Sequence, residues 1–262
     1  MNLRRIKAIL MHEAFITRHS YEVINDIVIY PLWSIIVFGF LTIYLAGVAG
    51  AAVAHYVLIG MILWQIINIT QYSIAVGCLW DVWARNLTNI FITPISIGEY
   101  LIAYTISGAV KALVVIILGG ILSFLVFRFN ILQVGLVNFW LYFINLVLFA
   151  FTFGIIILSL VFRFGTRIQA FAWGLITFFQ PLMAVIYPVS ILPEPLKTIA
   201  YIFPPTYVFE AARTSLGTPQ IQWLPSLMAL FLNMVWFLLA VVFFNLMFRQ
   251  SREIGQFAKL EG

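Results

Sequence analysis

Six apolar stretches follow one another along the chain, and each is long enough to cross a bilayer core of about 30 Å, which takes about 20 helical residues. They lie near residues 27–46, 55–79, 101–127, 134–162, 168–191 and 223–248. Pro181 and Pro188 fall inside the fifth stretch and predict a kinked or broken helix there, because proline removes a backbone donor. The pattern predicts an all-α integral membrane protein with six transmembrane helices in a single domain, residues 1–262.

Composition supports the same class. The chain is 64% hydrophobic and 9% charged, with a mean hydropathy of +1.08, whereas soluble domains are roughly 45–50% apolar and about 25% charged. The net charge of +5 does not predict a nucleic-acid partner, because Lys and Arg are scattered at the ends of the apolar stretches. Cys78 is the only cysteine, so the chain forms no internal disulfide.

The basic residues also predict an orientation. If the N-terminus lies inside, the inner side receives 10 of the 14 Lys and Arg residues, the outer side 3, and Lys111 lies within a stretch. The positive-inside rule then places both termini and the loop 80–99 in the cytoplasm of a bacterial or archaeal cell, as a multi-pass plasma-membrane protein.

Residues 1–26 are expected to form a retained basic helix on the membrane surface. Leu3, Ile6, Leu10 and Phe15 fall roughly on one helical face. No apolar core of about 7–15 residues, as a signal peptide needs, follows the first basic residues. The alternative is an unstructured basic tail.

The loop 80–99 is the one amphipathic interruption between two long apolar runs. It is rich in polar and charged side chains, whereas no Asp, Glu, Lys or Arg occurs from Ile27 to Trp80. Its apolar residues recur at the i, i+4, i+7 and i+8 spacing of a helix that docks in a partner's groove, namely Trp83, Leu87, Ile90 and Phe91. Asp81 and Arg85 would supply the orienting charges. We expect this loop to bind something outside the bilayer.

A second interruption precedes the last apolar stretch. Pro204-Pro205 separates two segments too short to span, so residues 193–216 are expected to form a re-entrant hairpin that folds back to the outer side. Glu210 and Arg213 lie three residues apart and can pair on one helical face.

Polar and aromatic side chains within the apolar stretches are candidates for a translocation path. They are uncharged and fit a neutral glycan chain and a hydrophobic molecule equally well. Interhelical hydrogen bonds and interfacial aromatic belts are at least as good an explanation for each of them. The candidates are Trp64, Gln65, Asn68, Gln71, Trp140, Asn145, Trp173, Gln180 and Asn233.

Lys111 is the only charge inside a predicted span. An intramembrane charge is a functional candidate because its burial is costly. The alternative is that its side chain snorkels to the inner headgroups, since no carboxylate lies within another span to pair with it.

The order of these parts resembles the permease subunit of ABC-2-type exporters over nearly the whole chain. The most specific pieces are Arg85-Asn86-Leu87 followed by Thr93-Pro94 and Glu99, and the run from Leu192 to Arg213. The resemblance implies a coupling helix that docks on a separate ATP-binding subunit, and an outer re-entrant gate. Its coupling residues would be Asp81, Trp83, Arg85, Asn86, Leu87, Ile90, Phe91, Thr93, Pro94 and Glu99, and its gate residues Pro193, Pro204, Pro205, Tyr207, Glu210 and Arg213.

The resemblance further implies a homodimer that exports an amphiphile: a lipid-linked polysaccharide, a lipid or a hydrophobic drug. The sequence also indicates that this chain does not hydrolyse ATP itself, because no lysine follows the glycine run of a phosphate-binding loop. A partner is therefore the expected energy source. ATP and Mg would bind the partner, and we expect no catalytic residue, cofactor or metal in this chain. The alternatives are a gradient-driven carrier, which usually needs ionisable groups at mid-membrane, and a membrane-embedded enzyme or scaffold.

Overall fold

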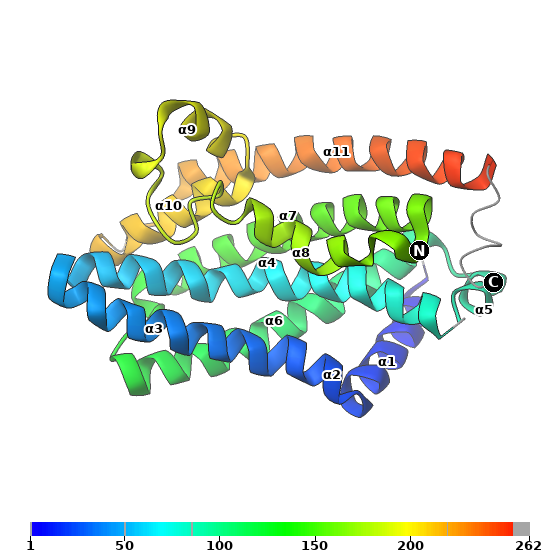
Figure 1. Cartoon of the computed structure of the whole chain (residues 1–262), viewed down its shortest axis with the longest axis horizontal. Helices are drawn as coiled ribbons and strands as arrows, with labels where there is room; N and C mark the ends of the chain where they lie inside the picture. Colours follow the sequence, from blue (N-terminus) through cyan, green and yellow to red (C-terminus); the bar gives the residue numbers. More distant parts are fainter. Residues whose placement is uncertain (1, 50, 85, 219, 254–262) are drawn as a thin grey trace.

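A computed structural model describes residues 2–49, 51–84, 86–218 and 220–253, and all regular secondary structure in these ranges is helical. The long helices run roughly along one axis (Figure 1), and they are α3 (Tyr30–Ala49), α4 (Ala51–Trp83), α6 (Ile97–Phe127), α7 (Leu136–Phe164) and α11 (Trp223–Glu253).

Short elements connect and precede the long helices. The N-terminal elements are α1 (Leu3–His19), α2 (Tyr21–Ile24) and the π-turn η1 (Asn25–Ile29), and the connections between α4 and α7 contain α5 (Leu87–Ile92) and η2 (Ile131–Val134). Between α7 and α11 lie η3 (Gly165–Ile168), α8 (Gln169–Phe179), η4 (Val189–Ile191), α9 (Glu194–Ala200) and α10 (Pro204–Gly217).

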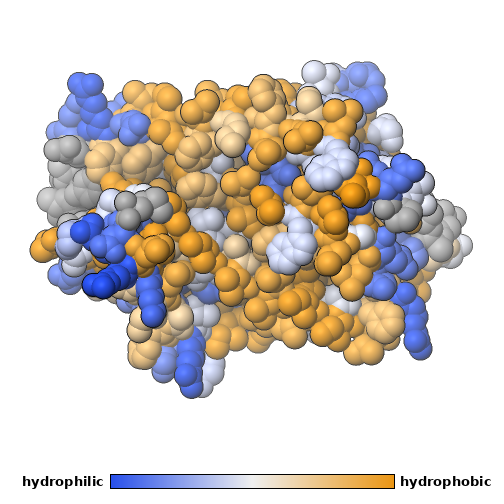
Figure 2. Space-filling model, turned by 180° about the vertical axis from the view of Figure 1, so that it is seen from behind, coloured by the Kyte–Doolittle hydropathy of each residue, from blue (hydrophilic) through white to orange (hydrophobic). Residues whose placement is uncertain are grey.

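Within the described ranges, five helices are long and apolar enough to cross a membrane. They cover Tyr21–Gly47, His55–Trp83, Ile97–Phe127, Leu136–Phe164 and Trp223–Ser251, and so coincide with five of the six predicted stretches. In Figure 2 a broad apolar belt separates hydrophilic surfaces at the two ends of the molecule. These features are those of a multi-pass membrane protein.

The predicted fifth transmembrane helix, 168–191, is not a continuous helix. Its helical part, α8, has 11 residues, which reach only about 16 Å. Pro181 follows two residues after α8, and the chain then turns at Ala184, whose φ is 55°. The predicted break is therefore confirmed, and no single helix forms a sixth span in the part of the chain that the structure describes.

α4 forms the centre of the bundle. Its spanning segment is 89% buried, against 28% for those of α3 and α6 and 17% for that of α11. α4 contacts α3, α6, α7, α8 and α10. A helix that is apolar on all sides is typically buried on all sides, and the outer helices instead expose apolar side chains where lipid would lie.

Glycine permits a close crossing of α4 and α6 at the core. A Cβ added at Gly108 in α6 would lie 2.8 Å from the Thr70 Cα in α4, too close for any larger residue. Such close approach through small residues is typical of helix packing in membranes.

The bundle has two distinct ends (Figure 1). α5 and the start of α1 lie at one end, called the α5 end here, and α9 with the connection between α6 and α7 lies towards the other, called the α9 end.

Candidate functional site

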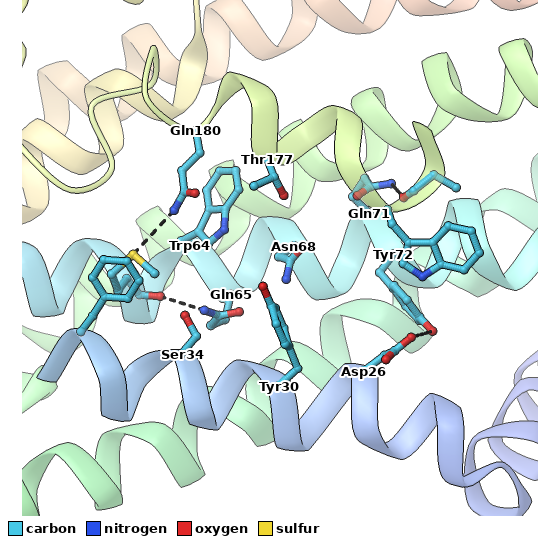
Figure 3. Close-up of a pocket in the computed structure, with 14 residues that line it drawn as sticks. Asp26, Tyr30, Ser34, Trp64, Gln65, Asn68, Gln71, Tyr72, Thr177 and Gln180 are labelled. Atoms are coloured by element: carbon cyan, nitrogen blue, oxygen red, sulfur yellow. Dashed lines mark hydrogen bonds between the residues drawn. The ribbon is translucent and has the colours of Figure 1, made fainter. Parts of the chain in front are cut away.

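A cavity of about 290 Å³ lies between α3, α4 and α8 (Figure 3). One wall comes from η1 and α3, which contribute Asp26, Tyr30, Ser34 and Phe38. These residues are spaced by four, so they lie on one face of a helix. The cavity is therefore partly built from the segment just before the first long helix.

The opposite walls come from α4 and α8. Gln71 of α4 donates a hydrogen bond to the Ala172 carbonyl of α8 at 3.0 Å, which joins the two helices. At one end of the cavity the Tyr72 hydroxyl donates to Asp26 Oδ2 at 2.8 Å. Gln180 contacts the sulfur of Met61 at 3.6 Å. The cavity thus combines amides, hydroxyls, aromatic rings and one carboxylate.

Six of the nine candidate path residues converge on this cavity: Trp64, Gln65, Asn68, Gln71, Trp173 and Gln180. The other three do not. Asn233 Nδ2 donates to the Asn145 backbone carbonyl at 3.0 Å, so these two form an interhelical contact between α7 and α11. Trp140 lines a separate, apolar groove between α6 and α7. For the asparagine pair, the structure shows the interhelical hydrogen bond that the packing alternative expects.

Eight of the fourteen lining residues were not among the candidates, and they include Asp26, Tyr30, Ser34 and Tyr72. Asp26 was left out because it precedes the first apolar stretch. A signal was present in the four-residue spacing of the first three, which places an acid, a phenol and a hydroxyl on the same helical face.

The loop 80–99 forms the connection between α4 and α6. Asp81 is buried rather than exposed for docking, and its Oδ2 accepts hydrogen bonds from the hydroxyls of Tyr100 at 2.6 Å and Tyr104 at 2.8 Å. Its backbone carbonyl accepts from the Asn86 amide at 2.9 Å. The predicted orienting charge therefore has internal partners that join α4 to α6.

Some of the other predicted coupling residues contact side chains of this chain, and others are exposed. The Trp83 ring stacks on the Trp173 ring of α8, with centroids 5.9 Å apart, so this side chain connects the loop to the cavity wall. Ile90 of α5 is partly buried and packs against a cluster of buried apolar side chains. Thr93 and Pro94 are exposed. Arg85 and the side chains of Leu87 and Phe91 lie outside the described residues.

Glu99 holds the start of α6. It completes a capping box with Ser96, and its carboxylate also accepts the Asn2 amide at 2.7 Å. Arg5 Nη1 lies 3.6 Å from Glu99 Oε2. Glu99 therefore ties α1 to the connection that carries α5.

Lys111 forms an ion pair with Glu13 of α1. Glu13 is buried, and this burial raises the pKa of its carboxyl, while Lys111 opposes the rise. Neither sequence-based interpretation of Lys111 considered this partner, because the carboxylate comes from the N-terminal helix and not from a span. The helix α1 packs against α6.

At the α9 end, the predicted pair of Glu210 and Arg213 is present, with Arg213 Nη1 3.0 Å from Glu210 Oε1. Arg213 is only 4% exposed. Its Nη2 also donates to the carbonyls of Ala184 and, at 2.8 Å, Val185. Arg213 therefore holds the broken segment after α8 against α10.

The remaining predicted gate residues belong to the same hairpin. Pro193 is exposed and precedes α9, whereas Pro204 and Pro205 are buried at the start of α10. The Tyr207 ring packs on the Tyr201 ring, with centroids 5.6 Å apart. Glu210 Oε1 accepts the Val189 amide at 2.9 Å, which adds a second tie to the broken segment.

We expect Asp81→Ala to lower the free energy of unfolding by about 3 kcal/mol, because buried hydrogen bonds to a charged group contribute about 1.5–3 kcal/mol each. Thermal unfolding of the purified chain in detergent measures this. Asp81→Asn is the control, since it keeps one acceptor oxygen and should lose less. A docking role without a structural one would instead leave the melting temperature of Asp81→Ala unchanged.

Within the described residues, no three His, Cys, Asp or Glu side chains gather closely enough to hold a metal ion. No protein-family model and no curated protein sequence matches this chain.

Proposed function

We propose that this chain is the membrane-spanning permease subunit of an ATP-driven exporter, which moves an amphiphilic molecule outward and takes its energy from a separate ATP-binding subunit. The observation that supports this best is the placement of α5. The short helix connects α4 and α6, the central helix and its neighbour, at one end of the bundle. A push on α5 would therefore act on the core of the bundle.

The connections around α5 suit such a role. Asp81 links α4 to Tyr100 and Tyr104 of α6, and Trp83 links the same region to the cavity wall through Trp173. Ile92 is 78% exposed at the end of α5, which leaves an apolar side chain for a partner to cover. We propose that the partner binds here, at the cytoplasmic side.

The proposal includes a second copy of the chain and a sixth crossing. α8 and the segment held by Arg213 would together complete this crossing as a broken helix, which membranes tolerate where the backbone is buried in protein. A closed two-fold dimer is the commonest assembly of identical chains, and α3, α6 and α11 all expose apolar side chains. The hairpin of α9 and α10 would form the outer gate.

One observation favours a gradient-driven carrier as the second candidate. The ion pair of Glu13 and Lys111 is buried, and Asp26 faces the cavity. Ionisable groups within membrane proteins commonly mark ion or proton pathways. Transport that requires ATP and persists without a proton gradient would support the exporter, and transport that requires the gradient alone would support the carrier.

The proposed function predicts that the tagged chain, expressed with the ATP-binding subunit of its host, purifies as a complex of two permease and two ATPase copies by native mass spectrometry. Leu87→Ala with Phe91→Ala should weaken the complex and abolish transport-stimulated ATP hydrolysis, because these residues form the predicted docking face.

The matched control is Leu132→Ala in η2, an exposed apolar residue in the connection between α6 and α7 and outside the three helices named above. This variant should leave complex formation and ATP hydrolysis unchanged. A chain that transports as a monomer without ATP, or a loop variant with normal turnover, would refute the proposal.

A further inference from the structure

The lining of the cavity between α3, α4 and α8 carries a formal negative charge and no positive one. Its fourteen lining residues include one carboxylate, Asp26, but no Lys, Arg or His. An anionic group placed there would meet a like charge with no cation to offset it. The lining therefore disfavours phosphate and carboxylate groups.

Asp26 has no ion-pair partner among the described residues. Its Oδ2 accepts from the Tyr72 hydroxyl at 2.8 Å and its Oδ1 from Asn25 Nδ2 at 3.3 Å. The side chain is half-buried. These neutral donors leave its formal charge uncompensated, in contrast to Glu13, which is paired with Lys111.

A second acceptor in the cavity, Gln65, differs from Asp26 in lacking a hydrogen-bond donor among the described residues. Gln65 is 2% exposed, its Nε2 donates to the Met61 carbonyl at 3.3 Å, and its Oε1 has no hydrogen-bond partner in the described part of the chain. A buried acceptor without a donor costs about 1–3 kcal/mol. In Figure 3 Gln65 lies on the α4 wall opposite Ser34 and Tyr30, so a ligand in the cavity could supply the donor.

Aromatic rings complete the lining. Tyr30, Trp64, Tyr72 and Trp173 border the cavity from three elements. Such rings attract cations through their faces, and the attraction strengthens when the site is shielded from water. Their apolar surface also accommodates a hydrophobic body.

We propose that this cavity binds an organic cation, a molecule with an apolar body that lies against the aromatic rings and a positively charged group that lies near Asp26. This inference rests on the proposed function only in naming the substrate class of the transport cavity. A saccharide would satisfy the hydrogen-bonding groups and stack on Trp64, but it would leave the charge of Asp26 uncompensated.

The test uses the full chain in phosphatidylcholine nanodiscs and two probes of nearly the same shape and opposite charge, tetraphenylphosphonium and tetraphenylborate. Isothermal titration calorimetry against protein-free nanodiscs should show saturable binding of the cation and none of the anion. Maltotriose, a neutral saccharide, should not displace the cation. This comparison needs no variant, so it does not depend on how a substitution affects folding.

Asp26→Asn should weaken tetraphenylphosphonium binding by about tenfold or more, because the substitution removes the charge and keeps the shape. The matched control is Glu22→Gln, which removes an exposed carboxylate four residues away that does not line the cavity. Gln65→Leu should weaken binding only of cations that carry an N–H donor, such as benzylammonium, and not of tetraphenylphosphonium.

Equal binding of the two charged probes, an unchanged affinity in Asp26→Asn, or displacement by maltotriose would overturn the inference, and the last result would identify a saccharide site. A negative calorimetry result would not affect the predicted complex with the ATPase subunit. Failure of that complex to form leaves the calorimetry unaffected, so the two proposals fail separately.

Discussion

Arg213→Ala is expected to lower the free energy of unfolding by about 3 kcal/mol. Removal of one partner from a buried ion pair typically costs about 3–5 kcal/mol, and the lower end applies because Glu210 is partly exposed. The guanidinium also donates to the carbonyls of Ala184 and Val185. Its loss leaves these acceptors without that donor and frees the segment after α8. Thermal unfolding in detergent measures the effect.

Glu210→Ala should cost less, because Arg213 would keep both carbonyl acceptors. The double variant should lose less than the sum of the single losses, since the two residues are in contact. If the hairpin is the outer gate, transport into inverted vesicles at matched expression should fall in both single variants. Full transport in both would remove the pair from gating.

Gly60 offers an independent check on the same segment from α4. A Cβ added at Gly60 would lie 1.9 Å from the Val185 carbonyl oxygen, so Gly60→Ala must displace the backbone that Arg213 holds. Gly174→Ala in α8 is the control, because no atom of the described residues lies within 4 Å of its added Cβ. Similar melting temperatures for the two variants would contradict the close packing of Gly60 against the Val185 carbonyl.

Lys111→Met is expected to destabilise the protein at pH 8 by about 3 kcal/mol, because Glu13 would be left buried without its cation. The loss should shrink towards pH 5. Burial already raises the pKa of Glu13, and removal of Lys111 raises it further. A raised pKa in the folded state contributes stability that is present at low pH and is lost as the pH rises through that pKa.

The double variant Lys111→Met with Glu13→Gln should recover most of the stability and lose this pH dependence, because a neutral pair replaces the lone carboxylate. Lys197→Met is the control: its pair with Glu194 is exposed and should contribute less than about 1 kcal/mol. Melting temperatures from pH 5 to pH 8 decide between these outcomes. A pH-independent loss in Lys111→Met would rule out a titrating Glu13.

The length of the apolar stretches correctly predicted the positions of the five long helices. A run of about 20 apolar residues has few alternatives to a membrane-spanning helix, since the backbone must satisfy its own hydrogen bonds in lipid. The same local physics correctly placed the break at Pro181. The pairing of Glu210 with Arg213 was also local, because three residues separate them on one helix.

Contacts between distant segments were decided by the tertiary structure alone. Lys111 and Glu13 are 98 residues apart, and no spacing rule connects them. The polar residues of the spans were visible in the sequence, but the rotation of each helix decides whether a side chain lines the cavity, as Asn68 does, or bonds to a neighbouring helix, as Asn233 does. Asp26 lines the cavity because α3 packs beside α4 and η1 leads directly into α3. Helix packing of this kind depends on side chains throughout the chain rather than on any local pattern.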